Sequence, residues 1–281
     1  MKAVIPAAGF GTRFLPLTKA QPKEMLPIVN KPTIQWVVEE AIDAGITDIA
    51  IITSKHKQAI ESHFRPMKGL ESTLAKTGKL RELEKIKEIN KSANFEFIIQ
   101  DEPKGLGHAI LCAEKFVGDS PFVVLLGDTI CIGNPNCTRG LIDIYNLNGK
   151  SVFAVEKVEL EDTKRYGIVS GKEFERDILK IEYLVEKPNP EEAPSRLAIL
   201  GRYVFNPDFF EYQRNITEGI GGEIQLTDAM QELAQKDELY SWTFPGKRYD
   251  IGTMKDWFQA HIQLSSKSEF SELLDEVIDN L

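Results

Sequence analysis

The sequence contains no hydrophobic stretch long enough to cross a membrane. A membrane-spanning helix takes about 20 consecutive apolar residues, and the apolar runs of this 281-residue chain are shorter. The first ten residues, MKAVIPAAGF, are interrupted by Pro6 and Gly9 and lack the small-residue cleavage site of a secretory signal. We therefore expect a cytoplasmic protein that does not bind a membrane.

Cysteine and positive charge are also scarce. The three cysteines, Cys112, Cys131 and Cys137, are odd in number and irregularly spaced, so they match neither a disulfide framework nor a zinc motif. Lys and Arg total 34 against 43 Asp and Glu, a formal net charge of −9. Because general nucleic-acid and acidic-membrane binders usually carry a basic surface, the composition argues against both classes. A small anionic substrate needs only a few local cations and is compatible with it.

Short apolar runs alternate with amphipathic segments. A strand is expected over residues 2–6, a helix over Pro32–Ala44 and a buried strand around Ile49–Ile52. Strand, loop, helix and strand in this order form a βαβ unit. Later apolar runs predict strands that end at Gln100 and Asp128.

The rest of the chain adds helices and further strands without a linker. Residues 67–92, rich in Lys, Glu and Leu, predict one or two exposed helices inserted after the βαβ unit. The second half is richer in strand-like segments, and the chain from Met254 onward has helical spacing. We expect a single α/β domain with a Rossmann-like, open, mostly parallel mixed sheet flanked by helices.

A glycine-containing loop, Ala7-Ala8-Gly9-Phe10-Gly11-Thr12-Arg13, follows the first strand. Gly9 and Gly11 let the backbone approach a phosphate and point N–H groups at it. Arg13 adds a planar fork of donors suited to phosphate oxygens. A dinucleotide-binding fingerprint would need glycine where Phe14 stands, and the P-loop pattern is absent as well. The loop therefore predicts polyphosphate binding and argues against an NAD-dependent oxidoreductase.

Residues 16–27, PLTKAQPKEMLP, continue this loop with Lys19 and Lys23. Their prolines prevent one uninterrupted helix. Lysines so close in sequence to the glycine turn can reach the same polyphosphate. The combination of G-x-G-T-R with the following P-K is more specific than either part.

Residues 3–32, AVIPAAGFGTRFLPLTKAQPKEMLPIVNKP, closely resemble the N-terminal signature of bacterial-type UTP–glucose-1-phosphate uridylyltransferases, within the sugar nucleotidyltransferase superfamily. Later blocks of that family follow in order: QDEPKGLGHAI, LLGD, RYGIV, VEKP, APSRLAILGRYVF, GGEIQLTDAM and YDIG. Sister families share G-x-G-T-R but usually lack this combination of PKEMLP and GLGHA. The resemblance implies transfer of the uridylyl group of UTP to glucose 1-phosphate, giving UDP-glucose and pyrophosphate. It also implies a homo-oligomer, either a dimer or a tetramer.

The resemblance assigns the nucleotide to the first half, residues 1–130. It implies that Ala8, Glu24, Gln100 and Gly105 surround the uracil, and a glutamine amide can both donate to and accept from a pyrimidine edge. The phosphates are expected over the glycine loop and its neighbouring cations. The expected nucleotide-binding residues are Ala7, Ala8, Gly9, Gly11, Thr12, Arg13, Lys23, Glu24, Gln100, Gly105 and Asp128.

Asp128 is expected to bind Mg²⁺. It ends the apolar run VVLLGD, and ligands of α/β sheets gather at the carboxyl ends of strands. Mg²⁺ prefers one or two carboxylates together with phosphate oxygens. Asp250, in RYDIGT, is the candidate second carboxylate, because related sugar nucleotidyltransferases use a matching pair.

The sugar phosphate is assigned by the resemblance to the second half, residues 131–253, which precedes C-terminal helices over 254–281. Glu186 is expected to accept two sugar hydroxyls, and Lys187 to meet the sugar phosphate. Gly167 would let the sugar lie against the backbone.

The expected reaction is attack of a sugar-phosphate oxygen on the α-phosphorus of UTP, with pyrophosphate leaving in line. Arg13, Lys23, Asp128 and Lys187 are the expected catalytic residues. They act by alignment and charge neutralisation, since the nucleophile is already an anion. Two alternatives stay open: a glucose-1-phosphate thymidylyltransferase that uses dTTP, because a methyl group supplies only about 1–3 kcal/mol of selectivity, and a catalytically inactive sugar-nucleotide-binding regulator.

Overall fold

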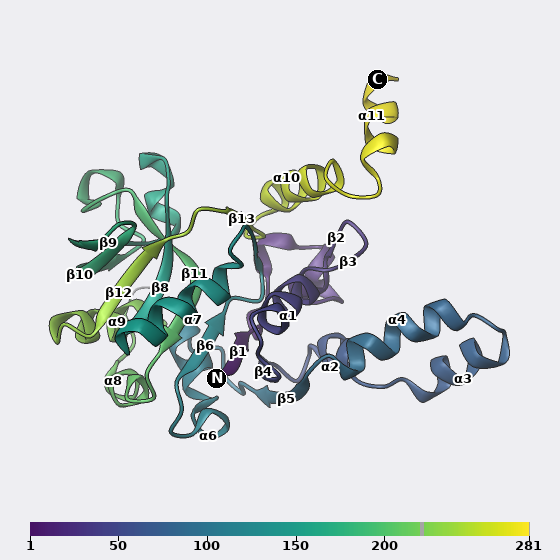
Figure 1. Ribbon diagram of the computed structural model, residues 1–281, viewed down its shortest axis with the longest axis horizontal. Coiled ribbons are helices and arrows are strands. Elements are labelled where there is room, and N and C mark those ends of the chain that lie inside the picture. Colours follow the sequence, from purple (N-terminus) through teal and green to yellow (C-terminus); the bar gives the residue numbers. More distant parts are fainter. Residues whose placement is uncertain (220–221, 281) are drawn as a thin grey trace.

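A nine-stranded sheet runs through the protein (Figure 1). The computed structural model describes residues 1–219 and 222–280, so Gly221 of the GGEIQLTDAM block and Leu281 of the C-terminal segment lie outside the described residues. The strand order is β5-β4-β1-β6-β11-β8-β12-β10-β9. The strands are β1 Lys2–Pro6, β4 Asp48–Thr53, β5 Asn94–Ile99, β6 Phe122–Leu125, β8 Ser151–Lys157, β9 Gly167–Glu175, β10 Ile178–Glu186, β11 Leu197–Phe205 and β12 Leu239–Thr243.

The first half of the sheet is parallel, as the sequence predicts. β1 pairs in parallel with β4 and β6, and β4 pairs in parallel with β5. Helix α1, Thr33–Asp43, connects β1 to β4 and confirms the βαβ unit. Residues 49–53 of β4 are all buried, which explains their continuous apolar run.

The second half corrects the prediction of an open, mostly parallel sheet. β11 runs antiparallel to β6, β8 and β9, and β10 runs antiparallel to β9 and β12. The additional β11–β9 pairing closes β11, β8, β12, β10 and β9 into a ring. Leu197 and Ala198 of β11 pair with β9, whereas Arg202–Phe205 pair with β6. Gly201 lies between them with φ +92°, a backbone conformation that favours glycine, so one strand serves both parts.

Helices cover the sheet, and two short antiparallel strand pairs flank it. The remaining strands are β2 Pro27–Ile28, β3 Lys31–Pro32, β7 Thr129–Ile132 and β13 Lys247–Asp250. The remaining α-helices are α2 Gln58–Phe64, α3 Lys68–Lys76, α4 Leu80–Lys91, α5 Leu106–Leu111, α6 Glu114–Val117, α7 Cys137–Asn148, α8 Phe209–Asn215, α9 Leu226–Gln235, α10 Met254–Ser265 and α11 Ser271–Asp279. Short 3-10 turns lie at η1 Thr12–Phe14, η2 Leu17–Lys19, η3 Lys23–Met25, η4 Leu160–Arg165 and η5 Pro190–Glu192.

The predicted helical insertion is the α3–α4 hairpin, which extends away from the body (Figure 1). α3 buries none of its residues, and α4 buries Leu83. The predicted C-terminal helices are α10 and α11. Among the described residues, no helix combines the length and apolar character that crossing a membrane requires.

Within the described residues, the core consists of three clusters of buried side chains. Successive residues of β1 separate two of them: Ala3 and Ile5 join one cluster, and Val4 joins the other, because side chains alternate along a strand. The third cluster contains Ile130 of β7, Tyr249 of β13 and Leu264 of α10. It fixes the antiparallel β7–β13 pair, and with it the loop that carries Asp128.

Candidate active site

Two adjoining cavities meet at the carboxyl end of β6. The first, of about 500 Å³, is formed by loops that follow β1, β5 and β6, and the second measures about 480 Å³. Arg13, Leu106, Leu126, Asp128 and Glu223 line both. The site is therefore one continuous space with two compartments.

The residues expected to bind the nucleotide line one compartment, and those expected to bind the sugar phosphate line the other. All those expected to bind the nucleotide line the first cavity: Ala7, Ala8, Gly9, Gly11, Thr12, Arg13, Lys23, Glu24, Gln100, Gly105 and Asp128. Those expected to bind the sugar phosphate, with the second expected metal ligand, line the other cavity: Gly167, Glu186, Lys187 and Asp250.

The glycine loop begins where β1 ends and stays tied to the sheet. The Ala7 amide donates to the Ile52 carbonyl at 2.7 Å. Gly11 has φ +65°, and a Cβ there would lie 3.2 Å from the Lys23 Cβ. Apart from Gly9 and its two chain neighbours, no described residue has an atom within 4 Å of the position that a Gly9 Cβ would take. The loop is therefore tightly built at Gly11 and open at Gly9, where a ligand can approach the backbone.

A buried ion pair between Lys57 and Glu24 supports the glycine loop. The Lys57 ammonium donates to the Ala7 carbonyl at 2.7 Å and to Glu24 Oε2 at 2.8 Å. Burial raises the pKa of Glu24 and lowers that of Lys57, against their mutual attraction. Lys57 was not predicted from the sequence. Its position shortly after the end of β4, at the same sheet edge as the glycine loop, is the signal that could have indicated it.

Gln100 closes the far end of the first cavity. It follows β5 and is 5% exposed. Its amide nitrogen donates to the Gly105 carbonyl at 3.2 Å and contacts His108 Nδ1 at 2.9 Å. Gly105 has φ +100°, and a Cβ there would lie 2.8 Å from the Ile224 carbonyl oxygen. The contact with His108 fixes the orientation of the Gln100 amide.

Asp128 lies in the turn between β6 and β7, three residues beyond the end of β6. Lys23 Nζ contacts Asp128 Oδ2 at 2.5 Å. Burial alone would raise the pKa of Asp128, but the attraction and hydrogen bond of Lys23 outweigh it and hold that pKa below its ordinary value. Burial would lower the pKa of Lys23, but Asp128 and Glu24 hold it above its ordinary value.

Asp250 comes close to Asp128 through the antiparallel pairing of β13 with β7. Asp250 pairs with Thr129, and the next amide, that of Ile251, donates to the Asp128 carbonyl at 2.8 Å. Burial and the nearby Asp128 carboxylate raise the pKa of Asp250. The structure thus brings together two carboxylates that are 122 positions apart in the sequence.

The sugar-side residues meet at the end of β10. Glu186 accepts a hydrogen bond from the Thr227 hydroxyl at 2.6 Å and contacts Lys187 Nζ at 2.9 Å. Lys187 has φ +46°, a left-handed conformation that is costly for a residue with a side chain. A Cβ at Gly167 would lie 2.8 Å from Ile199 Cδ1 and 3.2 Å from Glu186 Oε2, so a side chain there would have to displace the ends of both. Thr227 was not predicted from the sequence.

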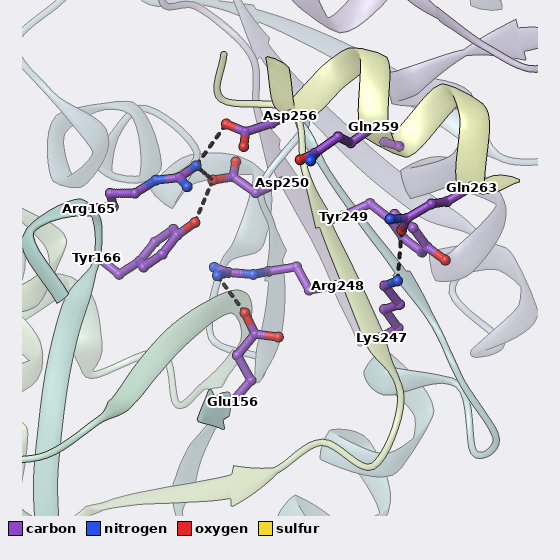
Figure 2. A pocket seen from close by; sticks show the side chains of 11 residues that line it. Glu156, Arg165, Tyr166, Lys247, Arg248, Tyr249, Asp250, Asp256, Gln259 and Gln263 are labelled. Atoms are coloured by element: carbon purple, nitrogen blue, oxygen red, sulfur yellow. Dashed lines mark hydrogen bonds and ion pairs between the residues drawn. The ribbon is translucent and has the colours of Figure 1, made fainter. Parts of the chain in front are cut away.

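A smaller cavity of about 250 Å³ adjoins the sugar side (Figure 2). It shares Arg165, Tyr166, Arg248 and Asp250 with the second compartment. Sequence reasoning singled out Asp250 alone among these four, because the other three are identified by contacts between distant segments.

Comparisons with known proteins agree with this geometry. A family model described as nucleotidyl transferase matches residues 2–267. UTP–glucose-1-phosphate uridylyltransferase YngB of Bacillus subtilis is 48% identical over 282 residues, covering 99% of this chain and 95% of the relative. A solved structure of UDP-glucose pyrophosphorylase complexed with UDP-glucose has a TM-score of 0.88 and 40% identity, covering 95% of this chain and 99% of that one.

A second solved structure, UTP-bound UGPase from Acinetobacter baumannii, has a TM-score of 0.90 and 33% identity, covering 99% of this chain and 98% of that one. The match therefore extends over almost the whole length of both chains. The chain belongs to the nucleotidyl transferase family, among its bacterial-type UTP–glucose-1-phosphate uridylyltransferases.

Proposed function

We propose that this protein transfers the uridylyl group of UTP to glucose 1-phosphate, giving UDP-glucose and pyrophosphate. The observation that carries this proposal is the joined pair of cavities, with Arg13 and Asp128 at their boundary. One compartment suits a nucleoside triphosphate and the other a phosphorylated sugar, and the boundary is where their phosphates meet. Relatives described as bound to UTP and to UDP-glucose support the choice of substrates.

The first compartment binds UTP. The uracil lies among Ala8, Glu24, Gln100 and Gly105, and the phosphates lie over the open backbone from Ala7 to Arg13. The Glu24–Lys57 pair keeps this wall rigid through the Ala7 carbonyl. Lys23 has three donors, so it can contact Asp128 and an α-phosphate oxygen together.

The second compartment binds glucose 1-phosphate. Glu186 accepts from sugar hydroxyls while Thr227 fixes its orientation. The Lys187 ammonium is half exposed at the cavity wall, where it can pair with the sugar phosphate and reduce its repulsion from the triphosphate. Gly167 leaves the space that the sugar ring needs.

Asp128 and Asp250 fit a Mg²⁺ ion. They are two oxygen ligands of the kind that Mg²⁺ prefers, they line the same cavity, and Asp250 Oδ1 accepts no hydrogen bond from the described residues. A bound Mg²⁺ would supply charge neutralisation to the phosphates.

In the transfer step, a phosphate oxygen of glucose 1-phosphate forms a bond to the α-phosphorus of UTP. The bond from that phosphorus to the α–β bridging oxygen breaks, and pyrophosphate leaves with the electron pair. Lys23 steadies the α-phosphate and Arg13 the departing pyrophosphate. No side chain has to remove a proton, because the nucleophile is an anion near neutral pH. The rate enhancement comes from alignment and from the surrounding cations.

Pyrophosphate release, measured with five nucleoside triphosphates and several sugar 1-phosphates, tests the proposal. UTP with glucose 1-phosphate should have the highest kcat/KM. A higher value with dTTP would favour the thymidylyltransferase alternative. Asp128→Ala should abolish turnover and keep the far-UV circular dichroism spectrum. Near-normal turnover would contradict the assignment of Asp128, and absence of Mg²⁺-dependent turnover in the unmodified chain would favour the inactive regulator.

The protein is also proposed to form a homo-oligomer. The α3–α4 hairpin exposes Met67, Leu70 and Leu80, and α11 exposes Leu273 and Val277. Apolar side chains on such projecting elements suit a contact between copies. Light scattering should give a mass of at least two chains, and a monomer at micromolar concentration would contradict the proposal.

A further inference from the structure

Asp250 receives two hydrogen bonds on one of its oxygens. The Tyr166 hydroxyl donates to Oδ2 at 3.0 Å, and Arg165 Nη2 donates to the same atom at 3.3 Å. Figure 2 shows both side chains reaching Asp250 from the same side. Two donors on Oδ2 fix the rotation of the carboxylate and leave Oδ1 without a bond from the described residues.

The two donors are themselves held by the surrounding structure. Arg248 stacks on the Tyr166 ring with its guanidinium carbon 4.0 Å from the ring centre, and Arg248 pairs with Glu156 at 2.5 Å. The Arg165 guanidinium carbon lies 5.2 Å from the same ring centre. The aromatic ring therefore has little freedom to turn its hydroxyl away from Asp250.

Arg165 links Asp250 to the C-terminal part of the chain. Its Nη2 also donates to Asp256 Oδ2 at 2.7 Å, in the first turn of α10. That carboxylate oxygen accepts from the Thr253 hydroxyl at 2.7 Å, and Thr253 Oγ1 caps the helix by accepting from the Asp256 amide. The Arg165 guanidinium thus links the Asp250 carboxylate to the start of α10, the helix that packs against β13.

We propose that Tyr166 and Arg165 are positioning residues that orient the Asp250 carboxylate for a divalent cation shared with Asp128. This inference rests on the proposed function, which assigns the cation to those two aspartates. Hydrogen-bond partners of a metal-binding carboxylate fix its geometry and strengthen its hold on the ion. Tyr166 is well suited to this role because its hydroxyl supplies one directed donor without adding a second charge.

Direct counting of bound Mn²⁺ tests the inference without measuring activity. Free Mn²⁺ is followed by electron paramagnetic resonance while the ion is titrated into metal-free full-length protein. Four chains are compared: the unmodified protein, Tyr166→Phe, Asp250→Asn and Tyr183→Phe. Tyr183 is an exposed tyrosine on β10, so its variant controls for loss of a phenolic hydroxyl elsewhere.

Tyr166→Phe should weaken Mn²⁺ binding about tenfold to 100-fold, while Tyr183→Phe should leave it unchanged. Asp250→Asn should weaken it at least as much. If Asp250→Asn weakens binding and Tyr166→Phe does not, the positioning role is wrong and the metal assignment stands. If Asp250→Asn has no effect, or the unmodified chain binds no Mn²⁺, the metal assignment fails and this inference fails with it.

A purely structural role gives a different result. In that case Tyr166→Phe would lower the melting temperature in EDTA and leave the Mn²⁺ dissociation constant unchanged. Arg165→Gln provides a second test, because it removes the link to Asp256 as well as the bond to Asp250. It should lower both Mn²⁺ affinity and the melting temperature, and an unchanged affinity in this variant would also overturn the inference.

Discussion

Lys187 combines a charged side chain with a left-handed backbone conformation at the end of β10. Such a conformation costs about 1–3 kcal/mol and is typical of functional sites. Here it follows Glu186 directly, and the Lys187 amide donates to the Tyr166 carbonyl at 3.1 Å. The backbone therefore fixes Lys187 between Tyr166, which contacts Asp250, and Glu186, which is expected to bind the sugar.

We expect Lys187→Ala to raise KM for glucose 1-phosphate much more than KM for UTP. A hydrogen bond to a charged group contributes about 1.5–3 kcal/mol, which corresponds to about a tenfold to 100-fold change. Steady-state kinetics with each substrate varied in turn measures both constants. Lys172→Ala is the control, because Lys172 is exposed on β9 and pairs with Glu182. An equal rise in both constants would place Lys187 elsewhere in the reaction.

His63 gives the protein a pH-dependent stability near neutrality. It lies on α2 in the wall of a cavity of about 520 Å³, and its Nε2 contacts Gln35 Oε1 at 2.9 Å. Burial lowers its pKa, although the nearby Glu39 opposes this. A folded-state pKa below the ordinary value of about 6.5 means that the unfolded chain binds the proton more tightly. The free energy of unfolding should therefore fall as the pH falls from about 7.5 to about 5.5.

His63→Gln keeps a donor for Gln35 and removes this titration. Between about pH 7.5 and pH 5.5, the unmodified protein should lose more stability than the variant, as measured by urea unfolding. Each unit by which the pKa is lowered corresponds to about 1.4 kcal/mol of lost stability. A variant that loses as much stability as the unmodified chain would rule out His63 as the source.

Among single residues, those in motifs could be predicted from the sequence, whereas those defined by contacts between distant segments could not. The glycine loop, Gln100 and Asp128 follow apolar runs, so their place at the sheet edge could be predicted. Lys57 and Tyr166 lie next to recognisable segments, but their partners are 33 and 84 positions away. Such contacts depend on how strands pair, which local sequence does not specify.

The Glu40–Arg202 ion pair joins several elements beneath the site. Arg202 on β11 is fully buried and donates to both oxygens of Glu40 on α1. Its Nη2 also donates to the Thr129 carbonyl at 2.6 Å, beside Asp128. Thr138 of α7 donates to Glu40 Oε1 at 2.7 Å. The pair therefore connects two helices, a central strand and the loop that carries the candidate metal ligand.

We expect Arg202→Met to lower the free energy of unfolding by about 3–5 kcal/mol, because it leaves the Glu40 carboxylate buried without a partner. Urea unfolding at neutral pH measures the change. Adding Glu40→Met should recover part of the loss, since apolar side chains can replace a buried pair. Arg214→Ala breaks an exposed pair with Glu114 and should cost at most about 1 kcal/mol. A similar cost for Arg202→Met and Arg214→Ala would contradict this account.

Elements were easier to predict from the sequence than their pairing. Helix α1, the inserted helical hairpin and the C-terminal helices follow from periodicity over adjacent residues. The closed ring does not, because β11 reaches β9 across 21 intervening positions, between Glu175 and Leu197, and bends at Gly201. A strand that pairs with different neighbours at its two ends has no local signature, so an open sheet was the simpler expectation.

At the scale of the whole molecule, the halves expected to bind the nucleotide and the sugar phosphate share one structure. The boundary expected near residue 130 falls inside β7, and β6 of the first half pairs with β11 of the second. Both large core clusters also cross it, since one contains Val37 and Tyr240, and the other Val4 and Leu239. The described residues of the two halves therefore share their core.

The two halves should therefore unfold together. Trp36 on α1 reports on the first half and Trp242 on β12 on the second. In single-tryptophan variants made by Trp→Phe substitution, each fluorescence midpoint in urea should coincide with that variant's own circular dichroism midpoint, because one continuous sheet and two shared clusters couple the halves. The contrary result would be different urea midpoints for Trp36 and Trp242 fluorescence in two variants of equal stability. The halves would then be independent units. The joined cavities would then lie between two domains, and binding of UTP in one would not fix the geometry of the other.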